Sequence, residues 1–316
     1  MRLSARKQPG FSLMELTTSL AIFLVVCSAA MWAMVEAQRR FRSMEIRTSI
    51  QSKMRGAFEL LAQEIGQAGL PGSGVDANGM AIPLTTLSAA VSSGSTITVA
   101  STAAIIPGEI LTLDNPNNQE ASAPLQVKSI SGSTITFYQT LALSHAVGAP
   151  VYVMGVFPGG VLSSSTASKL ELFGDVKALG ASLVLVEYLC PSTFPGAFTR
   201  SEYDVQSASL NNGPTTLVDN VTACTFTYPS TFPSTGAISG LNTSPTSFSM
   251  VTSVGISLTV QSQTPDPITG QYFSYTKTFL NIQPRNILAA NNEVTSGNTQ
   301  ELQPYDSTKG IFASLP

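Results

Sequence analysis

Histidine and charged residues are scarce in this chain of 316 residues. His145 is its only histidine, and charged side chains make up 11% of the sequence. A Ser-His-Asp nucleophilic site would have to be built around His145, which follows Ser144 in an expected turn, so we interpret His145 as structural. The three cysteines and the histidine lack zinc-site spacing, and no phosphate-cradling glycine motif occurs. The sequence therefore predicts a protein that is not an enzyme and that needs no cofactor or metal.

The acidic and basic residues argue against calcium and nucleic acid as partners. The acids are scattered singly, and the one oxygen-rich stretch, 114–120, lacks the glycine and the terminal glutamate of a calcium loop. We interpret this stretch as a turn. The formal net charge is −3 although the leader carries three cations, which argues against nucleic acid as the main partner.

A long apolar run is present at residues 11–35, and Glu15 is its only acidic or basic side chain. At 1.5 Å per residue the run is long enough to cross a hydrocarbon layer of about 30 Å. A carboxylate inside such a span costs about 2.5–3.5 kcal/mol on insertion scales. Glu15 is therefore expected only if another group compensates this cost.

Three interpretations of the apolar run involve no partner for Glu15. An ordinary signal peptide would be cut near residues 28–30 and leave a mature start near Met31. A lipoprotein signal would use Cys27, although Val26 stands where such signals have a small residue. An uncleaved signal anchor would place Glu15 at the lipid headgroups.

The stretch "GFSLMEL" at residues 10–16, after a short basic leader, resembles the class III signal of type IV prepilins. The resemblance implies that a prepilin peptidase cuts after Gly10, removes the leader 1–10 and methylates the new amino terminus at Phe11. It also implies that Glu15 meets the terminal amine of a neighbouring subunit. Low dielectric strengthens such a pair, which would compensate the carboxylate.

Three arginines just beyond the run bear on its orientation. Arg39, Arg40 and Arg42 lie at the end that the resemblance places away from the cytoplasm, so a positive-inside count does not favour this topology. Gly10 must nevertheless face a peptidase on the cytoplasmic side. We therefore expect the arginines to meet lipid headgroups or neighbouring subunits.

A second helical segment, 36–70, is predicted from apolar residues that recur every three or four positions. Pro71-Gly72 is expected to end it. Residues 54–68 are expected to pack on the chain's own sheet, and 36–53 to pack against helices in a filament. The stretch "MRGAFELLAQEIGQAGL" at 54–70 resembles PilW-like minor pilins, and J-type pseudopilins of type II secretion share much of it.

Two similar stretches define an inserted β module at 82–155. "SGSTITVA" at 93–100 and "SGSTITFY" at 131–138 each predict a Ser-Gly turn followed by a strand. We interpret them as a duplicated hairpin unit in a small β-barrel-like module. "LALSHAVGAPVYV" at 141–153 resembles the end of small β modules of phage and surface proteins.

The segment 156–289 is predicted to form an antiparallel sheet. Strands are expected at 179–190, 221–229, 248–261 and 271–283, and 290–316 is expected to form a loose tail. Cys190 and Cys224, at the ends of neighbouring predicted strands, can form a disulfide in an oxidising compartment or remain buried thiols. "LVDNVTACTFTY" and "FLNIQPRNI" resemble late strands of PilW-like proteins, with Arg285-Asn286 at the end of the last strand.

Together these features predict an α+β, pilin-like fold with a long N-terminal helix packed on an antiparallel sheet and an inserted β module. The resemblance implies a minor pilin of a type IV pilus. Its partners would be other major and minor pilins, the prepilin peptidase, the inner-membrane assembly machinery and membrane lipid. It would cross the inner membrane once with its globule in the periplasm, and enter the pilus after assembly. The alternatives are a J-type pseudopilin and a secreted β-rich binding protein with an ordinary signal peptide.

Overall fold

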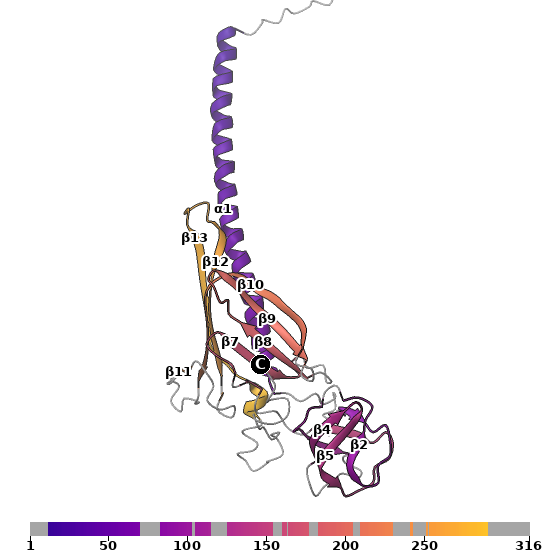
Figure 1. The fold of residues 1–316 in the computed structure, drawn as a ribbon. Coiled ribbons are helices and arrows are strands. Elements are labelled where there is room, and N and C mark those ends of the chain that lie inside the picture. Colours follow the sequence, from indigo (N-terminus) through magenta and orange to yellow (C-terminus); the bar gives the residue numbers. More distant parts are fainter. Residues whose placement is uncertain are drawn as a thin grey trace, which may run out of the picture. The chain divides into compact units, whose positions relative to one another are not determined.

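The computed structural model describes most of the helix and of two antiparallel sheets (Figure 1). The described residues are 12–69, 83–102, 105–114, 125–153, 160–162, 164–176, 183–204, 209–229, 241–242, 251 and 253–289. The leader, Phe11, the Pro71-Gly72 stop, residues 115–120 and the tail 290–316 lie outside them. The chain divides into two compact units, one of residues 1–51 with 262–273 and one of the remaining residues.

One continuous helix, α1, runs from Leu13 to Gln67 and includes both predicted helical segments. Ser12 precedes its first turn, and the Ser12 carbonyl accepts hydrogen bonds from the amides of Glu15 and Leu16 at 3.0 and 3.1 Å. Glu15 in this turn lies near the positive end of the helix dipole. The helix ends before the predicted stop, because Gly69 takes a left-handed conformation with φ of 78°.

The first unit joins α1 to the turn between two long strands, β12 (Val254–Pro265) and β13 (Tyr272–Ile282). Asp266 begins this β12–β13 turn (residues 266–271), and its amide donates to the Gln271 carbonyl at 2.8 Å. Asp266 Oδ2 accepts hydrogen bonds from Ser43 Oγ at 2.9 Å and Arg47 Nη2 at 3.1 Å. These bonds fasten the turn to one face of α1.

The larger sheet has seven antiparallel strands in the order β13-β12-β10-β9-β8-β7, with β11 paired to β10. Besides β12 and β13 they are β7 (Lys169–Gly174), β8 (Val184–Leu189), β9 (Gly196–Asp204), β10 (Leu210–Pro229) and β11 (Leu241–Asn242). A last helical turn covers 285–289. This sheet is more extensive than predicted, because β7 and β9 were not expected from the sequence.

The buried stripe of α1 packs on this sheet within the second unit. Its members Met54, Ala57, Phe58, Leu61, Ile65 and Ala68 are all buried. The Phe58 ring lies 5.0 Å from the ring of Phe279 on β13. Aromatic side chains of the sheet extend this core. The rings of Tyr188 and Phe198 are stacked, with their centres 5.9 Å apart. The second half of α1 therefore buries its apolar face inside its own chain.

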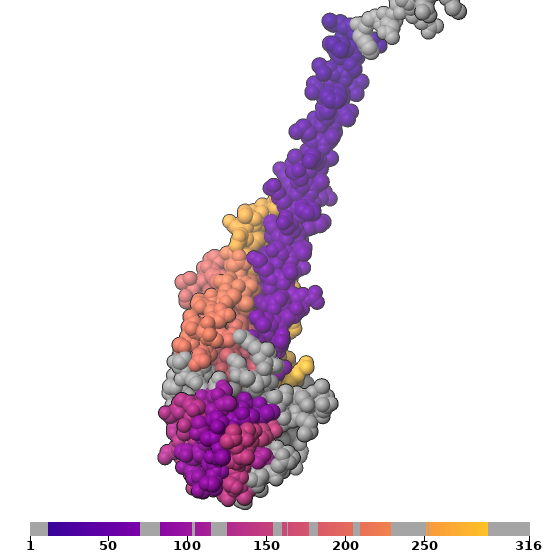
Figure 2. All heavy atoms as spheres, turned by 90° about the vertical axis from the view of Figure 1, so that its right-hand side faces the viewer, coloured from indigo at the N-terminus to yellow at the C-terminus, as the bar shows by residue number. Residues whose placement is uncertain are grey.

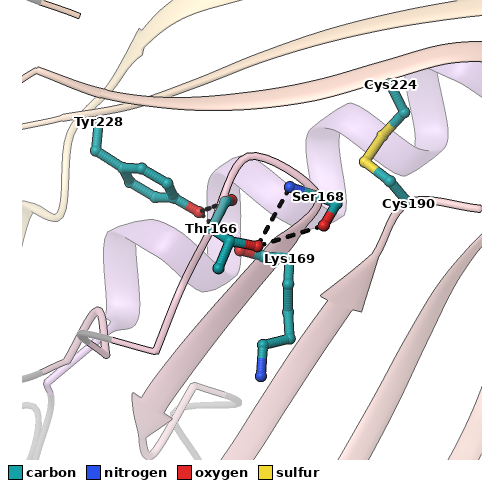
Figure 3. Close-up of a disulfide and its surroundings, with 6 residues drawn as sticks. All are labelled: Thr166, Ser168, Lys169, Cys190, Cys224 and Tyr228. Atoms are coloured by element: carbon teal, nitrogen blue, oxygen red, sulfur yellow. Dashed lines mark hydrogen bonds between the residues drawn. A yellow bond between two sulfur atoms is a disulfide. The ribbon is translucent and has the colours of Figure 1, made fainter. Parts of the chain in front are cut away.

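A disulfide joins Cys190 and Cys224, the pair identified from the sequence, with Cα atoms 5.7 Å apart (Figure 3). It links the end of β8 to β10. The sequence suggested that these two strands are neighbours. This is wrong, because β9 lies between them in the sheet. The chain between the two cysteines includes β9, and the disulfide closes it into a loop. In the chain-entropy model this loop stabilises the fold by about 3–4 kcal/mol.

Side-chain hydrogen bonds hold the turn at residues 166–169, which lies beside the disulfide (Figure 3). Tyr228 Oη donates to the carbonyls of Thr166 and Lys169, at 3.1 and 2.9 Å. The Ser168 amide donates to Thr166 Oγ1 at 3.3 Å. Burial raises the pKa of the Tyr228 phenol above its usual range, so its hydroxyl remains a donor.

The β module is a second curled antiparallel sheet, in the order β1-β6-β3-β4-β5-β2. Its strands are β1 (Thr85–Thr86), β2 (Gly94–Thr98), β3 (Ile110–Leu113), β4 (Leu125–Ser131), β5 (Thr134–Leu141) and β6 (Pro150–Val153). Its hydrophobic core consists of aliphatic side chains and Phe137, all of which come from the β module itself. β1 and β2 are the two outer strands of this sheet. Leu87, which follows β1, and Val99, which follows β2, form an antiparallel β-bridge.

The two similar stretches of the β module pair with each other. Ile97 of the first lies opposite Ile135 of the second, in the antiparallel pair β2–β5. The second stretch closes the β4–β5 hairpin through Gly132, whose φ is 59°. The first only leads into β2. The expectation of two equivalent hairpins is therefore wrong: the repeated residues form one shared ladder.

A buried ion pair links α1 to the sheet in the second unit. Arg200 of β9 donates through Nη2 to Glu64 Oε1 at 2.7 Å and lies 3.3 Å, through Nη1, from Glu202 Oε2. The Tyr188 hydroxyl also donates to Glu64. Burial and the Glu64 charge raise the pKa of Tyr188 well above its usual value. Glu64 therefore accepts bonds from two strands at once.

Replacing one member of this pair should destabilise the fold. Arg200→Leu leaves Glu64 buried without its cation, and we expect the free energy of unfolding to fall by about 3–5 kcal/mol. Glu64→Leu with Arg200→Leu removes both charges of this pair and should recover part of the loss, because the buried Glu202 still loses the Arg200 cation. Chemical denaturation of the purified protein measures both values. An Arg200→Leu protein as stable as the wild type would contradict this role.

Candidate functional site: the exposed apolar half of the helix

The first half of α1 leaves its apolar side chains uncovered. Leu13, Phe23 and Trp32 are 81%, 62% and 73% exposed, and most large apolar residues between 13 and 35 are similarly open. Figure 2 shows side chains projecting from this indigo part of α1. By length and composition the segment is able to cross a membrane. An apolar surface of this size indicates a membrane or a partner as its environment.

Glu15 is the one site residue predicted in this segment whose position is described. It lies in the first turn of α1 with its side chain exposed. The other two, Gly10 and Phe11, lie outside the described residues. An exposed carboxylate on an otherwise apolar surface can bind a cation that arrives from another molecule.

The hydroxyl groups that follow Glu15 are satisfied within the helix. Thr17 and Thr18 donate to the Met14 carbonyl, each at 3.0 Å, and Ser19 donates to the Leu16 carbonyl at 3.0 Å. Backbone acceptors therefore remove the cost of placing these groups in lipid. Among the described residues at the start of the helix, this leaves Glu15 as the polar side chain without a hydrogen-bond or ion-pair partner.

The single histidine, His145, is buried in the β module. Its backbone amide and carbonyl form a bridge with Val91, at 2.8 and 3.0 Å. His145 Nδ1 lies 3.7 Å from Asp114 Oδ2. In the described part of the chain no group of three or more His, Cys, Asp or Glu side chains has an arrangement able to hold a metal ion.

Glu109 is a buried acid that was not recognised from the sequence. It is 1% exposed, and its Oε2 accepts a hydrogen bond from the Ile106 amide at 3.0 Å. Burial raises its pKa to about 8, and the Ile106 hydrogen bond partly offsets this rise. Its position before an apolar strand, after Pro107-Gly108, was the available sequence signal. The residue is therefore protonated in the folded protein near neutral pH.

An open hollow of about 550 Å³ lies between the last turns of α1 and the end of β13. Its lining includes Gln63, Gln67 and Arg285. Gln67 Oε1 accepts a hydrogen bond from Asn286 Nδ2 at 3.4 Å. The hollow thus includes the Arg285-Asn286 pair noted in the sequence. Its lining combines amide side chains, apolar groups and the Arg285 guanidinium.

Comparisons of this chain with protein-family models, with curated proteins and with solved structures find no match.

The buried Glu109 predicts a pH-dependent stability of the β module. Between about pH 4.5 and 8 the folded state holds a proton that the unfolded chain has lost, so stability falls as pH rises. The slope reaches about 1.4 kcal/mol per pH unit from this group. Denaturation at pH 5 and pH 8 measures it.

Glu109→Gln should reduce this slope and stabilise the protein at pH 8, because the amide carries no charge at either pH. Glu59→Gln is the matched control, since the Glu59 side chain is 69% exposed. An unchanged slope in the Glu109→Gln protein would show that the carboxyl group is ionised in the fold.

Proposed function

We propose that this chain is a PilW-like minor pilin, a noncatalytic subunit that takes part in assembly or priming of a type IV pilus. The observation that carries the proposal is one carboxylate, Glu15, which lies within the prepilin-like stretch 10–16 and in the first turn of an uncovered apolar helix. A lone carboxylate there needs an external cation. A subunit with a free amine at Phe11 would provide one.

The proposed mechanism begins with processing. A prepilin peptidase cuts after Gly10, and the new amino terminus at Phe11 is methylated and keeps its positive charge. Glu15 of one subunit then pairs with this amine on a neighbour as the apolar helices pack. The pair forms in a low-dielectric environment, where both its strength and the cost of leaving it unmade are large. Glu15 therefore acts as a docking check between subunits.

The architecture supports this role. The first half of α1 has its apolar side chains exposed, whereas the second half is buried against an antiparallel sheet. We regard this division as pilin-like and the β module, whose outer strands are linked by the Leu87–Val99 bridge, as a barrel-like insertion. Before assembly the protein would cross the inner membrane once, with the sheet and the β module in the periplasm. The disulfide suits that oxidising compartment.

Two other functions remain as alternatives with a sequence feature in their favour. The stretch 54–70 is shared with J-type pseudopilins, which would place the same assembly chemistry in type II secretion. The apolar helix also fits a signal sequence, which would release a secreted β-rich binding protein. The two classes differ in where the mature chain begins.

Mass spectrometry of the mature amino terminus tests the proposal. We expect a chain that begins with N-methylated Phe11 when the protein is expressed with a prepilin peptidase. Gly10→Val should block the cut and leave the leader attached. A mature chain that begins near Met31 would contradict the proposal and favour the secreted protein.

A further inference from the structure

Two arginines next to the apolar segment of α1 lack acidic partners. Arg39 and Arg42 are exposed and form no ion pair or hydrogen bond with any side chain that the structure describes. Arg40 differs, because its Nε lies 3.1 Å from Glu36 Oε1. Glu45 is the one other acid of this part of the helix, and it is exposed. Two cations are therefore available to an external anion.

The two arginines lie at the depth of lipid headgroups if the apolar segment spans a membrane. Arg39 and Arg42 are about 6 and 10 Å beyond Val35 along the helix axis. The polar layer of a bilayer is about 5–8 Å thick on each side of the hydrocarbon. Trp32, 73% exposed, lies where tryptophan is enriched in membrane helices. Helical side chains tilt towards the N-terminus, so the arginines extend back towards this boundary.

The β12–β13 turn lies beside α1 (Figure 1). Asp266 is fastened to Ser43 and Arg47, as described above. The Arg47 guanidinium also lies 5.1 Å from the centre of the Phe273 ring, which secures the other side of the turn. Ser43 follows Arg39 by one helical turn, so the β12–β13 turn and Arg39 share a face.

The fastened turn and the first residue of β13 expose two side chains suited to a membrane surface. Ile268 is 54% exposed and Tyr272 is 52% exposed. Tyrosine has an apolar ring and a polar hydroxyl, and it is enriched at membrane interfaces. The acid of this turn, Asp266, is neutralised by Arg47 at 3.1 Å. An apolar and an aromatic side chain are therefore exposed beside an acid that is already paired with a cation.

We propose that Arg39, Arg42 and the β12–β13 turn form a surface that binds anionic phospholipid headgroups. The proposal depends on the membrane span of the proposed function and goes further by assigning a ligand to the residues outside that span. The guanidinium groups bind headgroup phosphates through paired N–H donors, while Ile268 and Tyr272 contact the layer beneath. It also gives a reason for arginines at the end of the span where the positive-inside rule disfavours them.

The test uses the full-length protein in phosphatidylcholine vesicles with increasing fractions of phosphatidylglycerol. Trp32→Phe removes the only tryptophan, and Ile268→Trp places a reporter in the turn. We expect phosphatidylglycerol to shift its emission to the blue and protect it from acrylamide. High salt should weaken both effects, because the contact is electrostatic.

Variants of the charged residues make the test specific. Arg39→Gln and Arg42→Gln should each raise the fraction of phosphatidylglycerol needed for half the shift by about fivefold, while Glu45→Gln should lower it. Arg55→Gln is the matched control, because Arg55 pairs with Glu59 at 2.9 Å and lies far along the chain from Arg39. It should leave the response unchanged.

Two results would overturn the proposal. The first is an emission that does not respond to phosphatidylglycerol, or that responds equally in the arginine variants. The second is a shift that follows protein density instead of lipid charge, which would assign the surface to a second copy of the chain. Alkaline carbonate extraction of the same vesicles reports the membrane span separately. A chain retained without a shift contradicts only the headgroup surface, whereas a chain washed out contradicts the span as well.

Discussion

The structure depends on one constraint: both halves of the single helix α1 carry apolar side chains, and both therefore need an apolar environment. The second half of α1 finds it inside the chain, where Met54, Phe58 and Leu61 are buried. The first half keeps its apolar side chains exposed within the chain. Burial of apolar surface is the main stabilising contribution in folding and in association. The exposed first half is therefore compatible with a membrane anchor or a signal sequence, and we propose that other subunits cover it after assembly.

The carboxylates of the chain differ in whether a group of the same chain binds them. Glu64, in the buried half, is satisfied by Arg200 at 2.7 Å and by the Tyr188 hydroxyl. Asp266 is satisfied by Ser43 and Arg47. Glu15 is exposed, with no ion-pair partner among the described residues. The same carboxylate chemistry thus fixes the fold at two positions, whereas at Glu15 we propose that it selects a neighbour.

The sequence predicted the features that depend on local patterns and missed those that depend on pairing between distant segments. Apolar periodicity predicted α1 and its buried stripe, and the positions of Cys190 and Cys224 at the ends of predicted strands indicated the disulfide. Strands β7 and β9 were missed because "KLELFG" and "GAFTRSEYD" carry charges at positions that the fold then neutralises or exposes. The Glu64–Arg200 pair could not be predicted, because the two residues meet only when α1 packs on the sheet. Likewise the pairing of the two similar β stretches with each other follows from the register of the sheet.

The central claim is that the Glu15 carboxylate is needed because another subunit's amino terminus neutralises it. Its most direct test is the amount of assembled pilus formed by a Glu15→Gln chain that is processed normally, compared with Glu59→Gln, which changes an exposed acid of the same helix that already pairs with Arg55. The account predicts that Glu15→Gln is cut and methylated but enters filaments poorly, while Glu59→Gln assembles like the wild type. Wild-type assembly by the Glu15→Gln chain would contradict it.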